Sequence, residues 1–246
     1  MGVDWLEVKR VANRLAEASP TGWLSDTATY ELLTLCGVPV PEWRVAINAD
    51  DVALAAKAIG FPVVLKAIAA DLLHKSDEKG VVLDVASAEQ ASAIAGDFAE
   101  RFGTRLQGIL VQRQCAPGIE LFVGINHESH TVPVLVIGAG GTDAEILDDR
   151  RVCVAPLNEN QARDALLSLR LSPKLTGYRT HPAVSLDPIV SLICRIGLLA
   201  TVVAEITELD LNHIVITSAS TLAVDARIRM AQNPQGPQPL QAMRRL

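Results

Sequence analysis

Cysteine is scarce in this sequence of 246 residues, and its few cysteines are scattered. Cys36, Cys115, Cys153 and Cys194 lie far apart and form no Cys-x-x-Cys pair. The spacing therefore indicates neither a zinc site nor a disulfide framework. We expect the four thiols to be reduced and to lie in the core.

A long apolar run is also missing. The nearest approach, IVSLICRIGLLATVVA at residues 189–204, has Arg195 in its middle, whereas a membrane span needs roughly twenty apolar residues. The first twenty residues carry acids and bases throughout, unlike a signal peptide. We therefore expect a soluble, cytoplasmic protein that does not enter a membrane.

Positive charge is in deficit, with a formal net charge of -6 at pH 7. This balance argues against binding nucleic acid through overall charge, although a local basic groove could still take a small polyanion. The composition, 49% hydrophobic and 20% charged, is that of a globular chain. Its length suits one large domain or two small lobes.

Hydrophobic periodicity and turn signals predict alternating strands and helices, as in an α/β or α+β fold. Residues 118–125 and 132–138 should form an antiparallel hairpin, and residues 171–184 a loop. The expected helices cover residues 4–18, 26–36, 50–60, 87–102, 159–169 and 187–203. The expected strands cover residues 43–47, 61–68, 81–85, 108–113, 118–125, 132–138, 152–157, 208–216 and 221–228.

Two basic groups stand close together early in the chain. Lys66 ends an apolar strand and could clamp a phosphate, although a lysine there can equally pack its stem and keep its head in water. His74 follows in the polar loop LLHKSDEKGVVL and could accept a phosphoryl group or a proton. A solvated turn explains the same composition, and the loop is not a P-loop.

Acidic and glycine-rich segments supply the remaining candidates. Strand alternation puts Glu208, Asp210 and Asn212 on one face, and the next strand can bring Asp225 alongside them. Such oxygen ligands suit magnesium, although a solvent-facing polar side is an equal alternative. Glu120 lies among strand residues and could face either water or a cleft. The run at 138–141 has three glycines, which suit an anion-binding turn or an ordinary hairpin turn.

Taken in order, these segments resemble the ATP-grasp subunit of ADP-forming (NDP-forming) acyl-CoA synthetases, which is related to the succinyl-CoA synthetase beta subunit. The resemblance covers about residues 24–230, and many ordered motifs are more specific than any one of them. The matching motifs lie at residues 37–41, 60–66, 73–77, 80–83, 110–112, 118–121, 138–141, 175–179, 208–212 and 224–228.

The resemblance implies a two-lobed ATP-grasp fold that holds ATP between two sheets. On this pattern residues 1–23 form an N-terminal helical arm, residues 44–105 a lid lobe, and residues 231–246 a flexible tail. The larger lobe would comprise residues 24–43 and 106–230.

The resemblance also implies a set of site residues. Lys66 would contact the ATP phosphates, His74 would relay a phosphoryl group, and Glu120 would lie near the ribose. The adenine hinge would comprise Val111, Gln112 and Cys115, and the magnesium ligands would be Asn212 and Asp225 with Asp210 beside them.

The implied reaction is acid + CoA + ATP ⇌ acyl-CoA + ADP + phosphate, carried by a phosphohistidine. The family's CoA-binding and ligase domains are not recognised in this sequence, so we expect an alpha-type partner subunit, and hence a hetero-oligomer, to provide them. Two alternatives stay open: a regulatory ATP-binding module without turnover, and another carboxylate-activating ATP-grasp ligase.

The sequence departs from the family pattern at a few positions. Lys79 stands where the family usually has a second glycine, and His213 where a proline often follows the asparagine. Cys153 replaces a common arginine, and Thr131-Val132 replaces Phe-Gly. These departures bear on the geometry of the loop that carries His74 and on the implied phosphate contacts.

Overall fold

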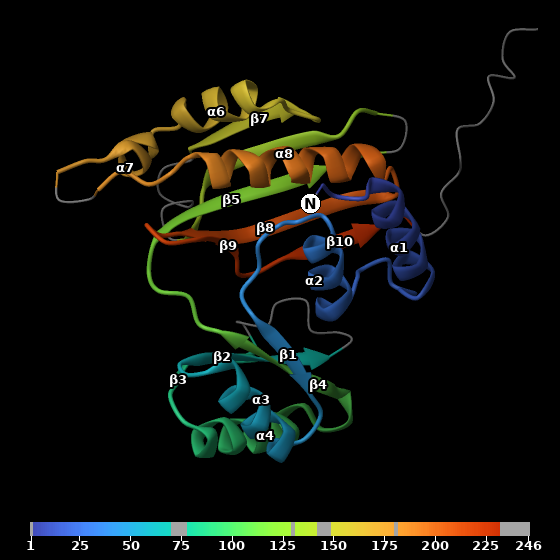
Figure 1. Cartoon of the computed structure of the whole chain (residues 1–246). Coiled ribbons are helices and arrows are strands. Elements are labelled where there is room, and N and C mark those ends of the chain that lie inside the picture. The colour runs from blue at the N-terminus through green and yellow to red at the C-terminus, as the bar shows by residue number, and fades with distance from the viewer. Residues whose placement is uncertain (1, 70–77, 129–130, 142–148, 180–181, 232–246) are drawn as a thin grey trace, which may run out of the picture.

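A computed structural model describes residues 2–69, 78–128, 131–141, 149–179 and 182–231. Within these ranges the chain forms two lobes, each built on its own antiparallel sheet (Figure 1). Each sheet has a separate hydrophobic core. None of the helices in the described ranges combines the length and hydropathy that a membrane span requires.

The smaller lobe is a four-stranded sheet covered by two helices. Its strand order is β1 (Trp43–Ala46), β4 (Leu106–Arg113), β2 (Val63–Ala69) and β3 (Val81–Val85). The helices α3 (Ala49–Ile59) and α4 (Ala88–Phe102) pack together on one face, and the short helix η1 (Gly103–Arg105) leads into β4 (Figure 1).

Local sequence explains why α4 forms and packs. Its N-cap is Ser87, whose hydroxyl accepts a hydrogen bond from the Gln90 amide. Its apolar side chains recur every three or four residues and so share one face. The buried members of that face are Ala88, Ala91, Ala95, Phe98 and Phe102.

The larger lobe is a six-stranded sheet. Its path runs β10 (Arg227–Met230), β8 (Ile206–Ile216), β5 (Ile119–Asn126), β6 (Val134–Ala139) and β7 (Arg150–Val154), and β9 (Thr221–Ala223) also pairs with β8. The predicted hairpin is confirmed, since β5 and β6 pair antiparallel.

Helices from both ends of the chain complete the larger lobe. The apolar helix α8 (Asp187–Val202) lies along the sheet beside α6 (Glu159–Leu167), and the short α7 (Ser172–Thr176) precedes it (Figure 1). The N-terminal helices α1 (Trp5–Glu17) and α2 (Asp26–Leu35) pack against the same core.

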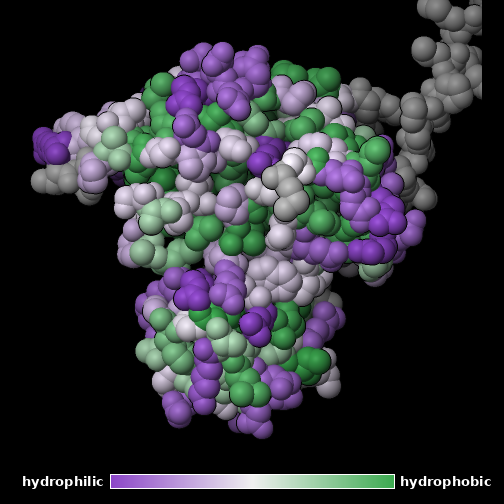
Figure 2. Space-filling view, in the orientation of Figure 1, coloured by the Kyte–Doolittle hydropathy of each residue, from purple (hydrophilic) through white to green (hydrophobic). Residues whose placement is uncertain are grey.

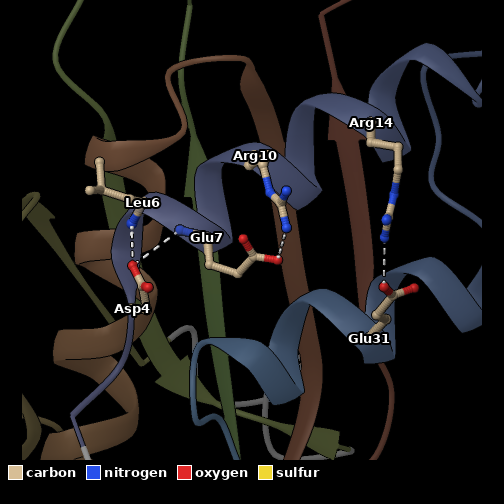
Figure 3. A network of polar contacts seen from close by, with 6 residues as sticks. All are labelled: Asp4, Leu6, Glu7, Arg10, Arg14 and Glu31. Atoms are coloured by element: carbon tan, nitrogen blue, oxygen red, sulfur yellow. Dashed lines mark hydrogen bonds and ion pairs between the residues drawn. The ribbon is translucent and has the colours of Figure 1, made fainter.

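The N-terminal arm is tied to α2 by charged groups (Figure 3). The Asp4 carboxylate accepts hydrogen bonds from the amides of Leu6 and Glu7, which caps α1. Farther along, Arg14 forms an ion pair with Glu31 of α2 at 3.0 Å. The arm therefore lies on the larger lobe and contacts α2 directly.

The structure corrects four expectations. Residues 106–113 do not join the larger lobe, because β4 pairs with both β1 and β2 at the centre of the small sheet. Residues 171–184 are not all loop, because residues 172–176 form α7, which has a proline in its first turn. The strand expected at 221–228 is two strands, β9 and β10, which pair with different parts of β8.

The fourth correction concerns the cysteines. All four are free thiols, as expected, but only Cys36 is fully buried. The other three are partly exposed: Cys115 lies in the connection after β4, Cys153 on the end strand β7, and Cys194 on α8. The predicted flexible tail falls outside the described residues from position 232 onward.

Candidate functional site

Lys66 of the smaller lobe meets a segment of the larger lobe. The side chain projects from the buried strand β2 and is only 7% exposed. Its Nζ donates a hydrogen bond to the Val224 carbonyl at 2.8 Å and lies 3.5 Å from the Asp225 carboxylate. The structure therefore brings together the predicted phosphate-binding lysine and a predicted magnesium ligand.

Gln112 reaches the same segment through a tyrosine. It lies on β4 next to Val64 of β2, and its Nε2 donates a hydrogen bond to the Tyr30 hydroxyl at 3.1 Å. Tyr30, from α2, donates in turn to the Val224 carbonyl at 2.9 Å. Sequence reasoning missed Tyr30, because one tyrosine on the buried side of a helix gives no signal that separates it from core.

Burial fixes the protonation state of this tyrosine. Desolvation raises the pKa of Tyr30 far above its ordinary value, and the nearby Asp225 carboxylate raises it further. The phenol therefore stays protonated at any working pH and can act as a hydrogen-bond donor.

Val111 and Cys115 lie on either side of Gln112 in sequence. The Val111 side chain is buried in the small core, so only its backbone can face a ligand. Burial raises the pKa of the Cys115 thiol, and the Lys66 ammonium opposes that rise, which places Cys115 within electrostatic reach of Lys66. The predicted hinge thus runs past the lysine.

Asp210 is a half-buried carboxylate on the side of β8 that faces away from the core. Its neighbours Leu209 and Leu211 point into the core, so alternation directs Asp210 to the opposite face. The Oδ1 atom is buried and has no hydrogen-bond partner among the described residues. Such an orphaned oxygen is a natural position for a cation.

The charges around Asp210 agree with that interpretation. Burial raises the pKa of Asp210 to about 6, Arg227 opposes the rise, and the acids Asp225 and Glu208 add to it. Asn212 lies two residues along the same strand face and is exposed. The predicted ligand set, Asp210, Asn212 and Asp225, has two carboxylates and an amide, which are oxygen ligands that suit magnesium. In the described ranges no group of three His, Cys, Asp or Glu side chains that could hold a metal occurs.

Glu120 lies against the glycine-rich turn. The Gly140 amide donates a hydrogen bond to the Glu120 carbonyl at 2.9 Å. Gly141 has φ +59°, and a Cβ atom there would overlap the Glu120 carboxylate. Glu120 and the glycines, separate features in the sequence, therefore lie together in the structure, and glycine at position 141 leaves the Glu120 carboxylate its present position.

The molecule narrows between its two lobes (Figure 2). A cavity of about 470 Å³ is lined by residues of both lobes. It is lined by Ile68, Ala69 and Gln107 of the smaller lobe and by the turn between α1 and α2. Arg227 also lines it and pairs in register with Asp210. Arg227 is a further site candidate. It belongs to the motif at residues 224–228, in which only Asp225 was given a role from the sequence. His74 lies outside the described residues.

Comparison with known proteins identifies the class. Residues 15–230 match the ATP-grasp domain family. The beta subunit of the ADP-forming acetate–CoA ligase I of Pyrococcus furiosus is 32% identical over 217 residues, which is 83% of this chain and 90% of that subunit. A trans-feruloyl-CoA synthase from an unknown prokaryotic organism is 34% identical over 84% of this chain, but the chain spans only 30% of its length.

Solved structures give the same result. The dinucleotide-forming acetyl-coenzyme A synthetase 1 of Ca. Korarchaeum cryptofilum, in complex with coenzyme A, Ca-AMPCP and HgCl+, has a TM-score of 0.84 and 29% identity, over 90% of this chain and 99% of that one. A form with coenzyme A and Mg-AMPPCP, whose phosphohistidine segment points towards the nucleotide-binding site, has a TM-score of 0.79 and 28% identity over 91% of this chain and 99% of that one.

The chain belongs to the ATP-grasp family. Within that family it is a homologue of the beta subunits of ADP-forming acetate–CoA ligases. The resemblance and the fold class inferred from the sequence are therefore confirmed.

Proposed function

We propose that this chain is the nucleotide-binding subunit of an ADP-forming acyl-CoA synthetase, which catalyses acid + CoA + ATP ⇌ acyl-CoA + ADP + phosphate. The observation that carries the proposal is the meeting of Lys66 with Asp225 between the lobes, near Asp210, whose Oδ1 atom has no hydrogen-bond partner among the described residues. A buried ammonium beside one acid, which in turn lies near a second acid, suits a metal–polyphosphate ligand: the phosphates would pair with the ammonium and the cation with the carboxylates.

Each nucleotide-binding role is assigned to one of the residues described above. Lys66 would neutralise phosphate charge. The backbone of Val111 and Gln112 would face the adenine with Cys115, and Glu120 would accept hydrogen bonds from the ribose. Positioning and electrostatics dominate phosphoryl transfer, so these contacts would supply most of the catalysis.

Asp210, Asn212 and Asp225 would hold the magnesium ion, which when bound offsets the negative charge of the phosphates. Without a bound magnesium ion, the Asp225 carboxylate of the larger lobe forms an ion pair with Lys66 of the smaller lobe. The same carboxylate therefore serves the ammonium in the absence of ligand and would serve the metal in its presence.

A partner subunit would complete the reaction. One relative is itself named a beta subunit, and another relative is a single chain of which this domain spans 30%. Both observations support a CoA-binding alpha-type partner in a cytoplasmic hetero-oligomer that also binds the carboxylic acid. Affinity purification of the full chain from its native cells should recover such a partner, and recovery of the chain alone would contradict this part of the proposal.

His74 is the proposed phosphoryl relay. Incubation of the chain with labelled ATP and magnesium, alone and with the captured partner, should give an acid-labile phosphoprotein, because phosphohistidine hydrolyses in acid. His74→Ala should lose the label on this chain. His127→Gln provides the control, because the His127 ring lies on the larger lobe, with its nitrogens 3.2 Å from the Ile206 carbonyl and 3.0 Å from the Thr131 carbonyl.

The outcomes separate the alternatives. Labelling that survives in His74→Ala would contradict the relay. ATP binding without labelling in any variant or mixture would instead favour a regulatory module. Labelling in acid-stable form would point to a different residue and a different mechanism.

A further inference from the structure

Tyr30 occupies a junction between three parts of the molecule. Its hydroxyl donates to the Val224 carbonyl of the larger lobe at 2.9 Å and accepts from Gln112 of the smaller lobe at 3.1 Å. The Val224 carbonyl also accepts from the Lys66 ammonium at 2.8 Å. One carbonyl therefore uses both lone pairs, one for the tyrosine and one for the lysine.

Two of the three N–H donors of the Lys66 ammonium face Val224 and Asp225, so contacting the phosphates with more than one donor requires the ammonium to move. The side chain is 7% exposed, so few water molecules can replace the hydrogen bond that the carbonyl loses when the ammonium moves. A part-buried carbonyl left without a donor opposes that movement. A second donor to the same oxygen lowers this cost.

We propose that Tyr30 is a positioning residue that keeps the Val224 carbonyl hydrogen-bonded when Lys66 transfers to the nucleotide phosphates. The inference rests on the proposed function, because it takes a phosphate-bearing nucleotide as the ligand that draws Lys66 away. Tyr30 itself touches neither the phosphates nor the metal. It makes the lysine easy to release and holds the Asp225 segment in place.

The surroundings of Tyr30 fit a fixed donor. The residue is 2% exposed, and its ring lies 5.7 Å from the ring of Trp43. Its helix α2 is held from one side by the ion pair between Arg14 and Glu31 (Figure 3). At the other end, the Arg195 guanidinium donates to the Cys36 carbonyl, which follows the last turn of α2. The hydroxyl is thus held from the larger lobe and does not depend on the lysine.

The variant Tyr30→Phe removes only the hydroxyl. In it, Gln112 loses its acceptor both with and without nucleotide, which lowers stability but not affinity. The Val224 carbonyl loses its remaining donor only when Lys66 leaves, which weakens phosphate binding. We expect the Kd for Mg-ATP, measured by calorimetry, to rise about tenfold. The Kd for adenosine, measured by saturation-transfer NMR, should not change.

Glu31→Ala is the matched control. It loosens α2 at the residue next to Tyr30 but leaves the hydroxyl in place, so affinity for Mg-ATP should stay at the wild-type value. If Tyr30→Phe folds poorly, the double variant Tyr30→Phe with Gln112→Met removes the stranded amide donor. It should restore stability and keep the ATP defect.

The results distinguish the inference from the proposed function. Unchanged Mg-ATP affinity in Tyr30→Phe, or an equal loss for ATP and adenosine, would overturn the positioning role while leaving the subunit assignment intact. Failure of the wild-type chain to bind Mg-ATP would instead overturn the proposed function itself.

Discussion

At the scale of single residues, Lys79 shows how a departure from the family pattern is accommodated. It has φ +54°, a left-handed conformation that glycine adopts without cost. Its carbonyl accepts a hydrogen bond from Arg101 at 2.6 Å, which helps to hold the turn. The backbone thus keeps the shape that a glycine would give.

Replacing this lysine should therefore stabilise the protein. We expect Lys79→Gly to raise the free energy of unfolding by up to about 1 kcal/mol, because relief of the left-handed strain exceeds the added freedom of the unfolded chain. Urea unfolding measures the change. Lys79→Ala keeps the strain and should show no gain; an equal gain from alanine would show that the side chain, not the backbone, is at issue.

The half-buried carboxylate of Asp210 should make stability depend on pH. Its pKa is raised to about 6 by burial, so the folded state holds a proton that the unfolded state releases near pH 4. Stability is therefore greatest below about pH 4 as far as this group is concerned, and falls as pH rises to about 6. Above about pH 6 the carboxylate is charged in both states, and the full free-energy cost of desolvating it lowers the stability.

Asp210→Asn removes this titration. Because the carboxyl is partly open to water, we expect the variant to be more stable than wild type by about 1–2 kcal/mol at pH 7.5 and equal to it near pH 4. Urea unfolding in the presence of a chelator, across that pH range, measures the difference. A difference that is constant with pH would contradict the raised pKa.

At the scale of elements, α2 carries Tyr30 and its attachment is the feature to test. The Arg195 guanidinium caps it from within the apolar helix α8, next to Gly37, where a Cβ atom would overlap that guanidinium. We expect Arg195→Met to lower the free energy of unfolding by about 1–3 kcal/mol, because the Cys36 carbonyl loses a charged donor. Glu31→Ala removes only an exposed ion pair and should cost about 0–1 kcal/mol.

Denaturant unfolding of both variants tests this order. A cost for Glu31→Ala equal to that for Arg195→Met would show that the exposed ion pair, not the part-buried cap, holds α2. In the sequence alone, Arg195 is only a break in an apolar run, and its contact with the end of α2 is seen only in the structure.

Elements could be predicted from the sequence where the signal is local. The helix at 87–102 has a serine cap and a regular apolar face, and β5 with β6 has a polar connection between two apolar runs. Pairing partners could not be predicted in the same way. Residues 106–113 join the small sheet because of contacts with β1 and β2, which lie about forty or more residues earlier in the chain.

The site shows the same limit. Lys66 and Asp225 were predicted from motifs that lie 159 residues apart in the sequence. In the structure the Lys66 Nζ atom is 3.5 Å from the Asp225 Oδ1 atom. Tyr30 was missed because its partner, Val224, contributes a backbone carbonyl, and a carbonyl leaves no trace in side-chain patterns. Apart from the corrected placement of residues 106–113, the domain boundaries stay predictions, and so do the roles of the site residues.

At the scale of the whole molecule, two lobes with separate cores meet at a narrow waist (Figure 2). Lys66 of the smaller lobe and Tyr30 of the larger lobe both contact the Val224 carbonyl. A ligand that separates Lys66 from Asp225 would link the lobes if it carried negative groups for Lys66 and a positive group for Asp225. Mg-ATP has the charges for this role: phosphates for the ammonium and a cation for the carboxylates.

The most direct measurement is the affinity of the full chain for ATP, with and without magnesium, in the wild type and in Asp225→Ala. Calorimetry should show that magnesium strengthens ATP binding to the wild type at least tenfold and that Asp225→Ala loses most of that gain. Tyr178→Phe, an exposed position, should behave as wild type. ATP binding that is equally strong with and without magnesium, or equal in Asp225→Ala, would contradict a metal–nucleotide site at the junction of the lobes.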